Sequence, residues 1–316
     1  MRPGQCTRRS TVEGTGIRMK LQRYYGNPIL APIPAHEWES RTVFNCGVAQ
    51  TRDQVILIYR AQGIGSDISR LGYATSRDGF TFERFRYPVF EPEADMEAWG
   101  VEDPRLTWLD GRWQMVYTAW SPLGIQVARA STSDFLVWER HGIVLPGPDN
   151  KDAAIFPDKV NGRYVMFHRI PPDIWLAYSD DMVHWGDYRK IMEPRPGSWD
   201  NLKIGAGGPP IRTEHGWLCI YHGVDSEKVY RLGVALLDLE DPTRVIGRPD
   251  EPILEPEEPW ELEGDVPNVV FTCGTAEIDN RYFVYYGGGD KVIAVATANR
   301  DDLLEFARTG TSDAAQ

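Results

Sequence analysis

The chain has no long hydrophobic run and no excess of basic residues, and each absence excludes a class of protein. No apolar segment approaches the ~18 residues that a membrane-spanning helix needs, and residues 1–18 lack the apolar stretch of a secretory signal. Lys and Arg together number 34 against 46 Asp and Glu, so the net charge is −12. A chain this acidic is not expected to bind nucleic acid or an anionic membrane surface.

Cysteine is scarce and scattered, which argues against both a disulfide framework and a metal site. The four cysteines form no CxxC pair and show no metal-ligand spacing: Cys6, Cys46, Cys219 and Cys273. Scattered thiols are typical of reduced cytosolic proteins, so we expect a cytoplasmic protein. The sequence also lacks a P-loop and a GxGxxG motif before a helix. We therefore expect no metal ion and no organic cofactor.

A short passage with strand-like residues recurs five times along the chain. Each copy contains an alanine that serves as a marker, and the five markers are Ala74, Ala128, Ala177, Ala235 and Ala296. The copies recur at intervals of roughly 50–60 residues, which is typical of a propeller built from four-stranded blades. Five copies predict an all-β, five-bladed β-propeller with a central funnel as its active site.

The repeats divide the chain into one domain and two short ends. We expect residues 19–307 to form the propeller, because a single blade cannot bury its own faces. Residues 1–18 are polar and are expected to be disordered, which makes Met19 a candidate for the true start. Residues 308–316 are expected to form a flexible tail. No segment predicts a helix, and the 30 Gly and 23 Pro suit many short connections.

Two strands of each blade can be placed from the residue pattern. The second strands are rich in β-branched and aromatic residues, and they cover Val55–Arg60, Trp113–Thr118, Tyr164–Arg169, Trp217–His222 and Tyr282–Gly287. The strand before each of them is the innermost of its blade, and its first residues are expected to face the funnel. Polar residues or glycines open these inner strands, near Asn45, Glu102, Lys151, Gly205 and Asn268.

The strongest candidate for chemistry is the pair of adjacent carboxylates at the start of the second inner strand. Successive residues of a strand point to opposite faces, so only one of Glu102 and Asp103 is expected to enter the funnel. Asp103 shares its face with Arg105, unless Pro104 distorts the strand. One carboxyl could act as a general acid whose pKa is raised by burial. An ion pair within the blade explains the same spacing equally well.

Cationic side chains form a second signal at the ends of the second strands. Arg60, His168, Arg169 and His222 occupy equivalent ends in different blades, and Lys203 precedes the fourth inner strand. A single such residue is more often a surface ion pair. Several that converge on one rim of an acidic protein instead predict a cradle for an oxyanion or phosphate.

These motifs together resemble glycoside hydrolase family 130, the β-mannoside phosphorylases and some β-mannosidases. The resemblance runs from about Tyr24 to Leu304, and its motifs are Gly100–Arg105, Phe167–Arg169, Lys203–Pro210, Tyr221–Gly223 and Tyr285–Asp290. It implies a five-bladed propeller, in agreement with the repeat count.

The resemblance also implies a role for each candidate residue. Asp103 would be the proton donor, acting on the glycosidic oxygen partly through a hydroxyl of the mannose ring. Phosphate would be bound by Arg60, Arg169, Lys203 and His222. The mannoside would be bound by Asn45, Cys46, Glu102, Arg105, Asp152, His168 and Asp290. The family often has serine where this chain has Cys46, so that contact departs from the family pattern.

The chemistry favours phosphorolysis over hydrolysis. An inverting hydrolase needs a second carboxylate to activate water, whereas phosphate is already an anionic nucleophile and needs only a cationic cradle. The sequence therefore predicts that a β-mannoside oligosaccharide and inorganic phosphate are converted to α-mannose 1-phosphate and a shortened acceptor, reversibly.

Other functions remain open at this point. A β-mannosidase could use the same fold. Propeller glycosidases of the arabinanase and xylosidase type use an aspartate base at the start of the first blade, where this chain has Asn45. A non-catalytic propeller that binds sugars would not need Asp103. The sequence does not determine the linkage, the acceptor sugar or the oligomeric state, and it is compatible with a homo-oligomer.

Overall fold

The computed structural model describes residues 19–93, 95–147 and 149–309, and over these residues the strands form the five blades of a propeller, with blades one and five joined in one eight-stranded sheet. Blade one contains β2 (Thr42–Gln50), β3 (Val55–Gln62), β4 (Arg70–Ser76) and β5 (Glu83–Arg84). Blade two contains β6 (Gly100–Leu109), β7 (Arg112–Ser121), β8 (Gly124–Thr132) and β9 (Glu139–Leu145). Blade three contains β10 (Lys151–Ile155), β11 (Tyr164–Ile170), β12 (Asp173–Ser179) and β13 (Gly186–Met192).

The two remaining blades depart slightly from this pattern. In blade four the inner strand is split into β14 (Lys203–Ala206) and β15 (Ile211–Thr213), which both pair with β16 (Gly216–Val224), and β17 (Tyr230–Leu237) and β18 (Val245–Gly247) follow. Blade five contains β19 (Val270–Ile278), β20 (Arg281–Gly288) and β21 (Val292–Asn299), and its outer strand is β1 (Gln22–Arg23) from the other end of the chain.

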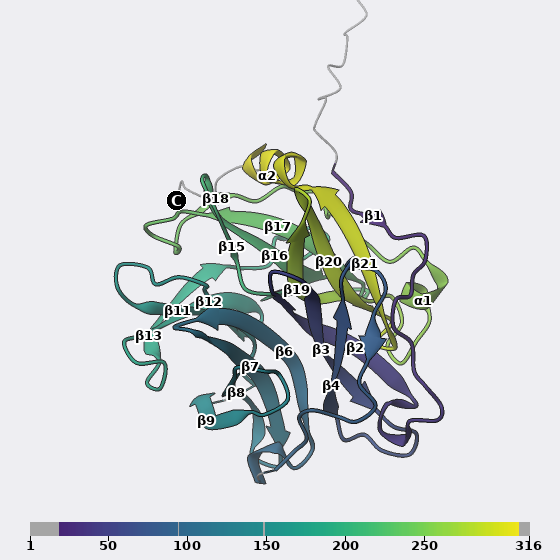
Figure 1. The fold of residues 1–316 in the computed structure, drawn as a ribbon. Helices are drawn as coiled ribbons and strands as arrows, with labels where there is room; N and C mark the ends of the chain where they lie inside the picture. Colours follow the sequence, from purple (N-terminus) through teal and green to yellow (C-terminus); the bar gives the residue numbers. More distant parts are fainter. Residues whose placement is uncertain (1–18, 94, 148, 310–316) are drawn as a thin grey trace, which may run out of the picture.

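The first strand of the chain completes the last blade and so helps to close the ring. β1 pairs with β21 in antiparallel register, Gln22 opposite Thr297, and Figure 1 shows the purple strand beside the yellow one. On the inner side, β19 pairs in parallel with β2 at Cys273 and Gly47. The inner strands β2, β6, β10 and β14 contact one another in sequence order. The predicted five-bladed propeller is thus confirmed.

The marker alanines all lie on third strands, and each is buried in a different hydrophobic cluster. Each of the five large clusters joins two adjacent blades, and each contains one marker: Ala74, Ala128, Ala177, Ala235 and Ala296. All five are 0% exposed. Interiors are close-packed, so a larger side chain at these positions would force neighbouring blades apart. The sequence repeat therefore records the packing between blades.

A buried ionic contact that the sequence did not predict recurs in four of the five blades. A tyrosine of the second strand donates its hydroxyl to a buried carboxylate that precedes the inner strand, and an arginine near the outer strand pairs with the same carboxylate. The four sets are Glu39, Tyr59 and Arg84; Glu97, Tyr117 and Arg140; Asp200, Tyr221 and Arg248; Glu261, Tyr286 and Arg23. Blade three has Phe167 at the tyrosine position.

The carboxylates of these sets come from short segments that lead into the blades. Glu39 ends the 3₁₀ turn η1 (Glu37–Glu39), Glu97 ends η2 (Asp95–Glu97), and Glu261 lies in α1 (Pro259–Leu262). Each segment is therefore tied by its carboxylate to the middle of the blade that follows it. A charge buried this deeply is stable only when it is paired and hydrogen-bonded, as all of these are.

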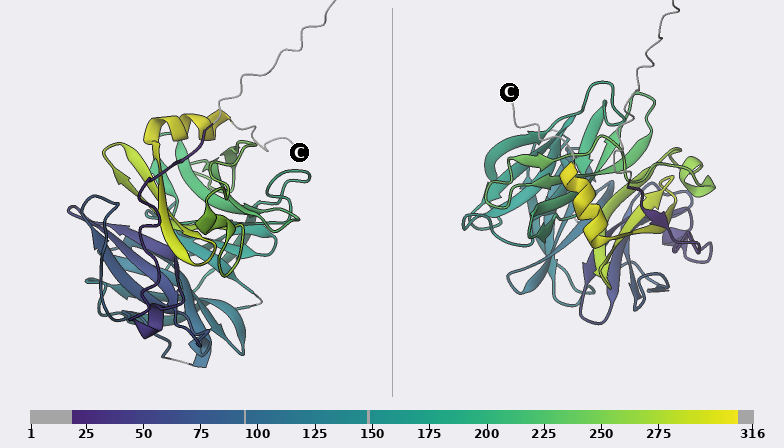
Figure 2. Two further views of the ribbon diagram at one scale, coloured as in Figure 1. Left: turned by 90° about the vertical axis from the view of Figure 1, so that its right-hand side faces the viewer. Right: turned by 90° about the horizontal axis from the view of Figure 1, so that it is seen from above.

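The sequence predicted no helix, and this prediction was wrong at the C-terminal end. Helix α2 (Arg300–Thr309) follows β21 and lies across one end of the molecule, against blades four and five (Figure 2). Asn299 caps it by accepting hydrogen bonds from the backbone N–H groups of Asp301 and Asp302. In the other blades the equivalent residues form a turn, whereas here Leu303 and Phe306 are buried and continue the turn as a helix.

The two predicted ends of the chain are only partly covered by the structure. Residues 1–18 lie outside the described residues, and Met19 packs against the cluster between blades four and five. The predicted tail begins at Arg308, but Arg308 and Thr309 are the last residues of α2, and residues 310–316 are outside the described part. None of the described helices is long and apolar enough to cross a membrane.

Candidate active site

The inner strands of blades one, two and three each carry a β-bulge at the residue that the sequence proposed for the site. The bulged residues are Asn45, Asp103 and Asp152, with φ angles of 44°, 49° and 54°. Asn and Asp tolerate this left-handed conformation better than other residues with a side chain. A bulge turns a side chain away from regular alternation. Here it allows Asn45 Nδ2 to donate to Asp103 Oδ1, 3.0 Å away in the next blade.

The bulge also corrects the expectation that Glu102 and Asp103 point to opposite faces. Both carboxylates bind one guanidinium: Arg60 Nη2 donates to Glu102 Oε1 at 2.5 Å, and Nη1 donates to Asp103 Oδ1 at 3.2 Å. The strand register shifts between Glu102 and Arg105, so strict alternation fails at this point. Ser69 fixes the guanidinium from the other side by accepting from Arg60 Nε at 2.9 Å.

The two carboxylates have different proton affinities despite their shared partner. Burial raises the pKa of Glu102, and the nearby charge of Asp103 adds to this, so the net pKa is above its usual value even beside Arg60. Burial also acts to raise the pKa of Asp103, but the charges of Arg60, Arg105 and Lys151 outweigh it, and the net pKa is lowered. In the free protein Asp103 is therefore ionised at neutral pH.

A second buried carboxylate, Asp152, organises the cationic side of the site. Arg105 Nη2 donates to Asp152 Oδ1 at 3.2 Å, and Arg169 Nη1 lies 2.6 Å from Oδ2. His222 Nε2 is 3.4 Å from the same Oδ2. Asp152 and Arg105 are each 1% exposed. Burial opposes ionisation of Asp152, but Arg169, His222 and Arg105 hold its pKa well below the usual value.

The two histidines of the predicted basic rim are neutral and not cationic. Burial lowers the pKa of His168 and of His222 to about 4, although Asp152 acts in the opposite direction on His222. The ring of His222 packs 4.4 Å from that of Phe271, and His168 Nδ1 lies 3.1 Å from Asn150 Oδ1. Both imidazoles are therefore uncharged at pH 7.

Lys203 joins the site, whereas Cys46 does not. Lys203 is half-buried at the start of β14, with Nζ 5.2 Å from the centre of the Tyr230 ring. The Cys46 side chain is 0% exposed and packs in the hydrophobic cluster between blades one and five. Burial raises the pKa of its thiol to about 12. The predicted contact between Cys46 and the mannoside therefore has no support in the structure.

Sequence reasoning placed Lys151 at the start of an inner strand without giving it a role, and it missed Tyr230. Lys151 precedes the bulged Asp152 in β10 as Glu102 precedes the bulged Asp103 in β6, and its charge lowers the pKa of Glu102 and of Asp103. This equivalence between blades was readable from the repeat. The Tyr230 ring lies 6.1 Å from that of His222, and only the tertiary structure brings the two together.

Asp290 lies half-buried in the turn between β20 and β21 and has an unusual proton affinity. Burial raises its pKa to about 6, Asp103 and Asp265 add to this effect, and Arg60 and Lys151 oppose it. The pKa of an unfolded aspartate is about 4, so the native state binds more protons than the unfolded state between about pH 4 and 6. The contribution of this group to stability is therefore lost as pH rises through that interval.

An Asp290→Asn variant tests this assignment, because asparagine tolerates the φ of 50°. From about pH 4 to pH 6 we expect the free energy of unfolding of wild type to fall progressively relative to that of the variant. Above about pH 7 the difference between the two should be constant. Urea unfolding at several pH values measures this difference. The control is Asp279→Asn, which has a φ of 49° in an exposed hairpin turn. Parallel curves for wild type and Asp290→Asn would contradict the raised pKa.

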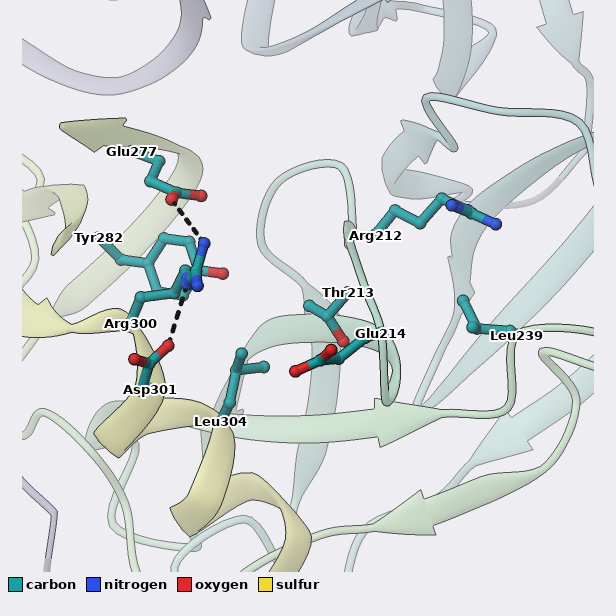
Figure 3. Close-up of a pocket in the computed structure, with 9 residues that line it drawn as sticks. All are labelled: Arg212, Thr213, Glu214, Leu239, Glu277, Tyr282, Arg300, Asp301 and Leu304. Carbon is teal, nitrogen blue, oxygen red and sulfur yellow. Dashed lines mark hydrogen bonds and ion pairs between the residues drawn. The ribbon is translucent and has the colours of Figure 1, made fainter. Parts of the chain in front are cut away.

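A cavity of about 510 Å³ lies at the C-terminal end of β19, beside the start of α2 and away from the site at Asp103 (Figure 3). Three of its charged groups pair with one another: Arg300 contacts Glu277 at 3.3 Å and Asp301 at 3.1 Å, as the dashed lines show. No buried acid faces an unpaired cation there, so it does not compete with the site at Asp103. Across the described residues no group of three or more His, Cys, Asp or Glu is arranged to hold a metal ion.

The fold and the site together define a propeller enzyme whose inner strands present buried carboxylates beside a set of cations. The chain belongs to glycoside hydrolase family 130: the family model described as beta-1,4-mannooligosaccharide phosphorylase matches residues 20–309. This confirms the resemblance found in the sequence.

Characterised relatives and a solved structure agree with the family assignment. The chain is 48% identical over 294 residues to a 1,2-beta-oligomannan phosphorylase of Thermoanaerobacter sp. (strain X514), which covers 90% of this chain and 99% of that protein. A beta-1,2-mannobiose phosphorylase of the same organism is also 48% identical, over 299 residues and the same shares of both chains. The structure of the Listeria innocua beta-1,2-mannobiose phosphorylase in complex with beta-1,2-mannobiose superposes with a TM-score of 0.85 at 31% identity, over 92% of this chain and all of that one.

Proposed function

We propose that the protein is an inverting phosphorylase of β-1,2-linked mannosides. An oxygen of inorganic phosphate attacks C1 of the terminal mannose, and the bond between C1 and the glycosidic oxygen breaks. Asp103 supplies the proton to that oxygen, partly through a hydroxyl of the mannose ring. The products are α-mannose 1-phosphate and an acceptor shortened by one mannose. A β-mannoside phosphorylase is the activity that the family and the relatives support directly.

The observation that carries the mechanism is that the buried carboxylates Asp103 and Asp152 are suited to different roles. A hydrolase would need a second carboxylate free to activate water. Asp152 is unsuited to that role, because Arg105, Arg169 and His222 surround it and hold its pKa low. The same arrangement presents Arg169 with Lys203 as a cradle for an anion. The characterised relatives are named as phosphorylases, so the alternative of a β-mannosidase is not favoured.

The lowered pKa of Asp103 places a requirement on the reaction, because a general acid must be protonated before it acts. Arg60 is the largest of the charges that keep Asp103 ionised. Phosphate bound beside Arg60 would offset this positive charge and raise the pKa of Asp103. Phosphate would thus supply the nucleophile and also prepare the acid, which would suppress unproductive hydrolysis in its absence.

The linkage is proposed from the relatives. The two Thermoanaerobacter enzymes at 48% identity are both named for β-1,2 linkages, and the superposed Listeria structure holds beta-1,2-mannobiose. The description of the family model names β-1,4-linked substrates instead. Relatives at 48% identity over nearly their whole length are the better guide, because loops that select the acceptor diverge quickly.

Three further expectations from the sequence belong to this proposal. Phosphate serves as co-substrate, and the reaction needs no metal or organic cofactor, because an acid and an anion cradle suffice for it. The buried free thiols of Cys46, Cys219 and Cys273 support a reducing, cytoplasmic location. A homo-oligomer remains a prediction, and sedimentation analysis would test it.

The decisive experiment incubates the protein with β-1,2- or β-1,4-mannobiose, each with and without inorganic phosphate. We expect mannose 1-phosphate and mannose only with phosphate, faster from the β-1,2 substrate, and the α anomer by NMR. Faster turnover of β-1,4-mannobiose would overturn the linkage. Release of two free mannoses at equal rates with and without phosphate would establish a hydrolase and overturn the mechanism.

A further inference from the structure

A cleft of about 460 Å³ opens between blade four and the segment that leads into β19. It shares Lys203 and Tyr230 with the candidate active site. At one edge of the cleft, the backbone N–H of Tyr230 donates a hydrogen bond to the carbonyl of Asn268 at 3.0 Å. The cleft therefore borders the cationic side of the site, where the Tyr230 ring packs beside that of His222.

Two lysines line this cleft, and neither has a carboxylate partner. Lys203 is half-buried, and Lys228 is exposed. Among the described residues neither ammonium group lies within 4.0 Å of a carboxylate oxygen. Burial lowers the pKa of Lys203, and the charges of Arg169 and Lys228 lower it further, whereas the charge of Asp152 opposes this. Among the described residues that line the cleft, the one carboxylate is that of Glu227, which is exposed.

The turn that carries Lys228 is held by the side chain of Asp225. The carboxylate of Asp225 accepts from the backbone N–H groups of Glu227 at 2.9 Å and Val229 at 3.0 Å, and from Arg231 Nη1 at 2.7 Å. The backbone N–H of Lys228 donates to the carbonyl of Asp225 at 3.0 Å, and Lys228 has a φ of 65°. This ordered turn places the backbone of Lys228 at the edge of the cleft, and its side chain is one of those that line it.

The walls of the cleft strengthen the effect of these charges. Leu202, Val224, Val266 and Pro267 supply apolar surface around the lysines. Clefts with low-dielectric walls and charges of one sign focus the electric field and raise the local concentration of counter-ions. The chain as a whole carries −12 and repels phosphate. A local cationic path is thus needed to bring this anion to Arg169 and Lys203.

We propose that this cleft is the entrance for inorganic phosphate, with Lys228 as the recruiting cation near its mouth and Lys203 as the next cation inward. This inference rests on the proposed phosphorylase function. The mannoside would use the axial funnel, so the two substrates would reach the site by different openings and need not bind in a fixed order.

The test compares Lys228→Gln, Lys228→Glu and Lys228→Arg with wild type in phosphorolysis of β-1,2-mannobiose at varied phosphate and NaCl. We expect the KM for phosphate to rise about 3- to 10-fold in Lys228→Gln and further in Lys228→Glu. The KM for mannobiose and the kcat at saturating phosphate should change less than about twofold, because a recruiting charge acts mainly on association. Lys228→Arg should resemble wild type.

The salt dependence separates recruitment from a structural effect. Wild-type kcat/KM for phosphate should fall as the NaCl concentration rises. This dependence should be weaker in Lys228→Gln, because the variant has less electrostatic attraction for salt to screen. The matched control is Lys159→Gln, an exposed lysine that packs 4.1 Å over the Tyr164 ring in blade three. It removes the same charge and should leave the KM for phosphate unchanged.

The outcomes distinguish this inference from the proposed function. Phosphate-dependent turnover by wild type establishes the function independently of Lys228. If wild type is active and the three variants keep its KM for phosphate and its salt dependence, the inference is overturned. A raised KM for mannobiose with an unchanged KM for phosphate would assign the cleft to the acceptor sugar and also overturn it.

Discussion

Replacing Asp103 with asparagine should reduce kcat for phosphorolysis by about 10²- to 10⁴-fold, the usual contribution of a general acid. Asparagine is the appropriate substitution because it tolerates the φ of 49° and can still accept from Asn45 and Arg60. It cannot supply a proton to the glycosidic oxygen. The KM for phosphate should not rise, because the variant loses a negative charge beside Arg60. Initial rates at varied phosphate and mannobiose measure both parameters.

A leaving group that needs no proton separates proton donation from a structural role of Asp103. With 2,4-dinitrophenyl β-mannoside as substrate, the loss in Asp103→Asn should be much smaller than with mannobiose, since the phenolate departs unprotonated. Asp279→Asn serves as the control: its φ is also 49°, and it lies in the hairpin at the far end of blade five. Turnover of mannobiose by Asp103→Asn within tenfold of wild type would refute the assignment of Asp103 as the acid.

Replacing Asp152 with asparagine should lower the free energy of unfolding by about 3–5 kcal/mol. The variant keeps the shape and the left-handed backbone, whose φ is 54°, but leaves Arg105 and Arg169 buried without a counter-charge. The cost therefore arises from uncompensated charge and not from lost packing. We also expect a raised KM for phosphate, because Arg169 loses the partner that orients it. Urea unfolding and initial rates provide the two measurements.

The same blade offers a matched control for Asp152. Asp187 has a φ of 50° and lies 2.6 Å from Arg163, the same distance as that between Asp152 and Arg169. Asp187 is exposed, so Asp187→Asn should cause no measurable change in stability. If the two variants lost equal stability, burial would not be the cause.

A double variant keeps the argument testable if Asp152→Asn is too unstable to purify. Replacing Arg169 with methionine removes one of the two unpaired charges and supplies a side chain of similar length. Asp152→Asn with Arg169→Met should therefore be more stable than Asp152→Asn alone, whereas Arg169→Met alone should destabilise wild type. Additive losses from the two changes would show that the pair is not coupled.

The number of blades could be predicted from residues alone, for a definite physical reason. Five marker alanines recur because each blade buries the same small residue against its neighbour, so the packing between blades is written into the sequence at a fixed period. The start of an inner strand marked Glu102 and Asp103 as candidates, whereas the choice of Asp103 as the acid came from the resemblance to the family and stays a prediction. Hydrophobic periodicity and repeat length are local properties that survive in a single sequence.

Only the tertiary structure decided the charges and contacts within the site. Strand alternation predicted that Glu102 and Asp103 diverge, but the bulge at Asp103 sends both to Arg60. A count of basic residues made His222 a cation, but complete burial leaves it neutral. Bulges and burial depend on contacts between blades that are distant in sequence, and no local pattern encodes them.

Helix α2 and the acid–tyrosine–arginine contacts were also decided by the tertiary structure and not by the sequence pattern. The residues after Asn299 match the turn of the other blades, and they become a helix because blades four and five offer an apolar surface to Leu303 and Phe306. The partners Glu261 and Arg23 lie far apart in the chain, and ring closure alone brings them together. The sequence by itself thus determined the architecture and narrowed the candidate acids to one adjacent pair. Folding decided which groups carry charge and what they contact, because burial and neighbours, more than residue type, set proton affinity.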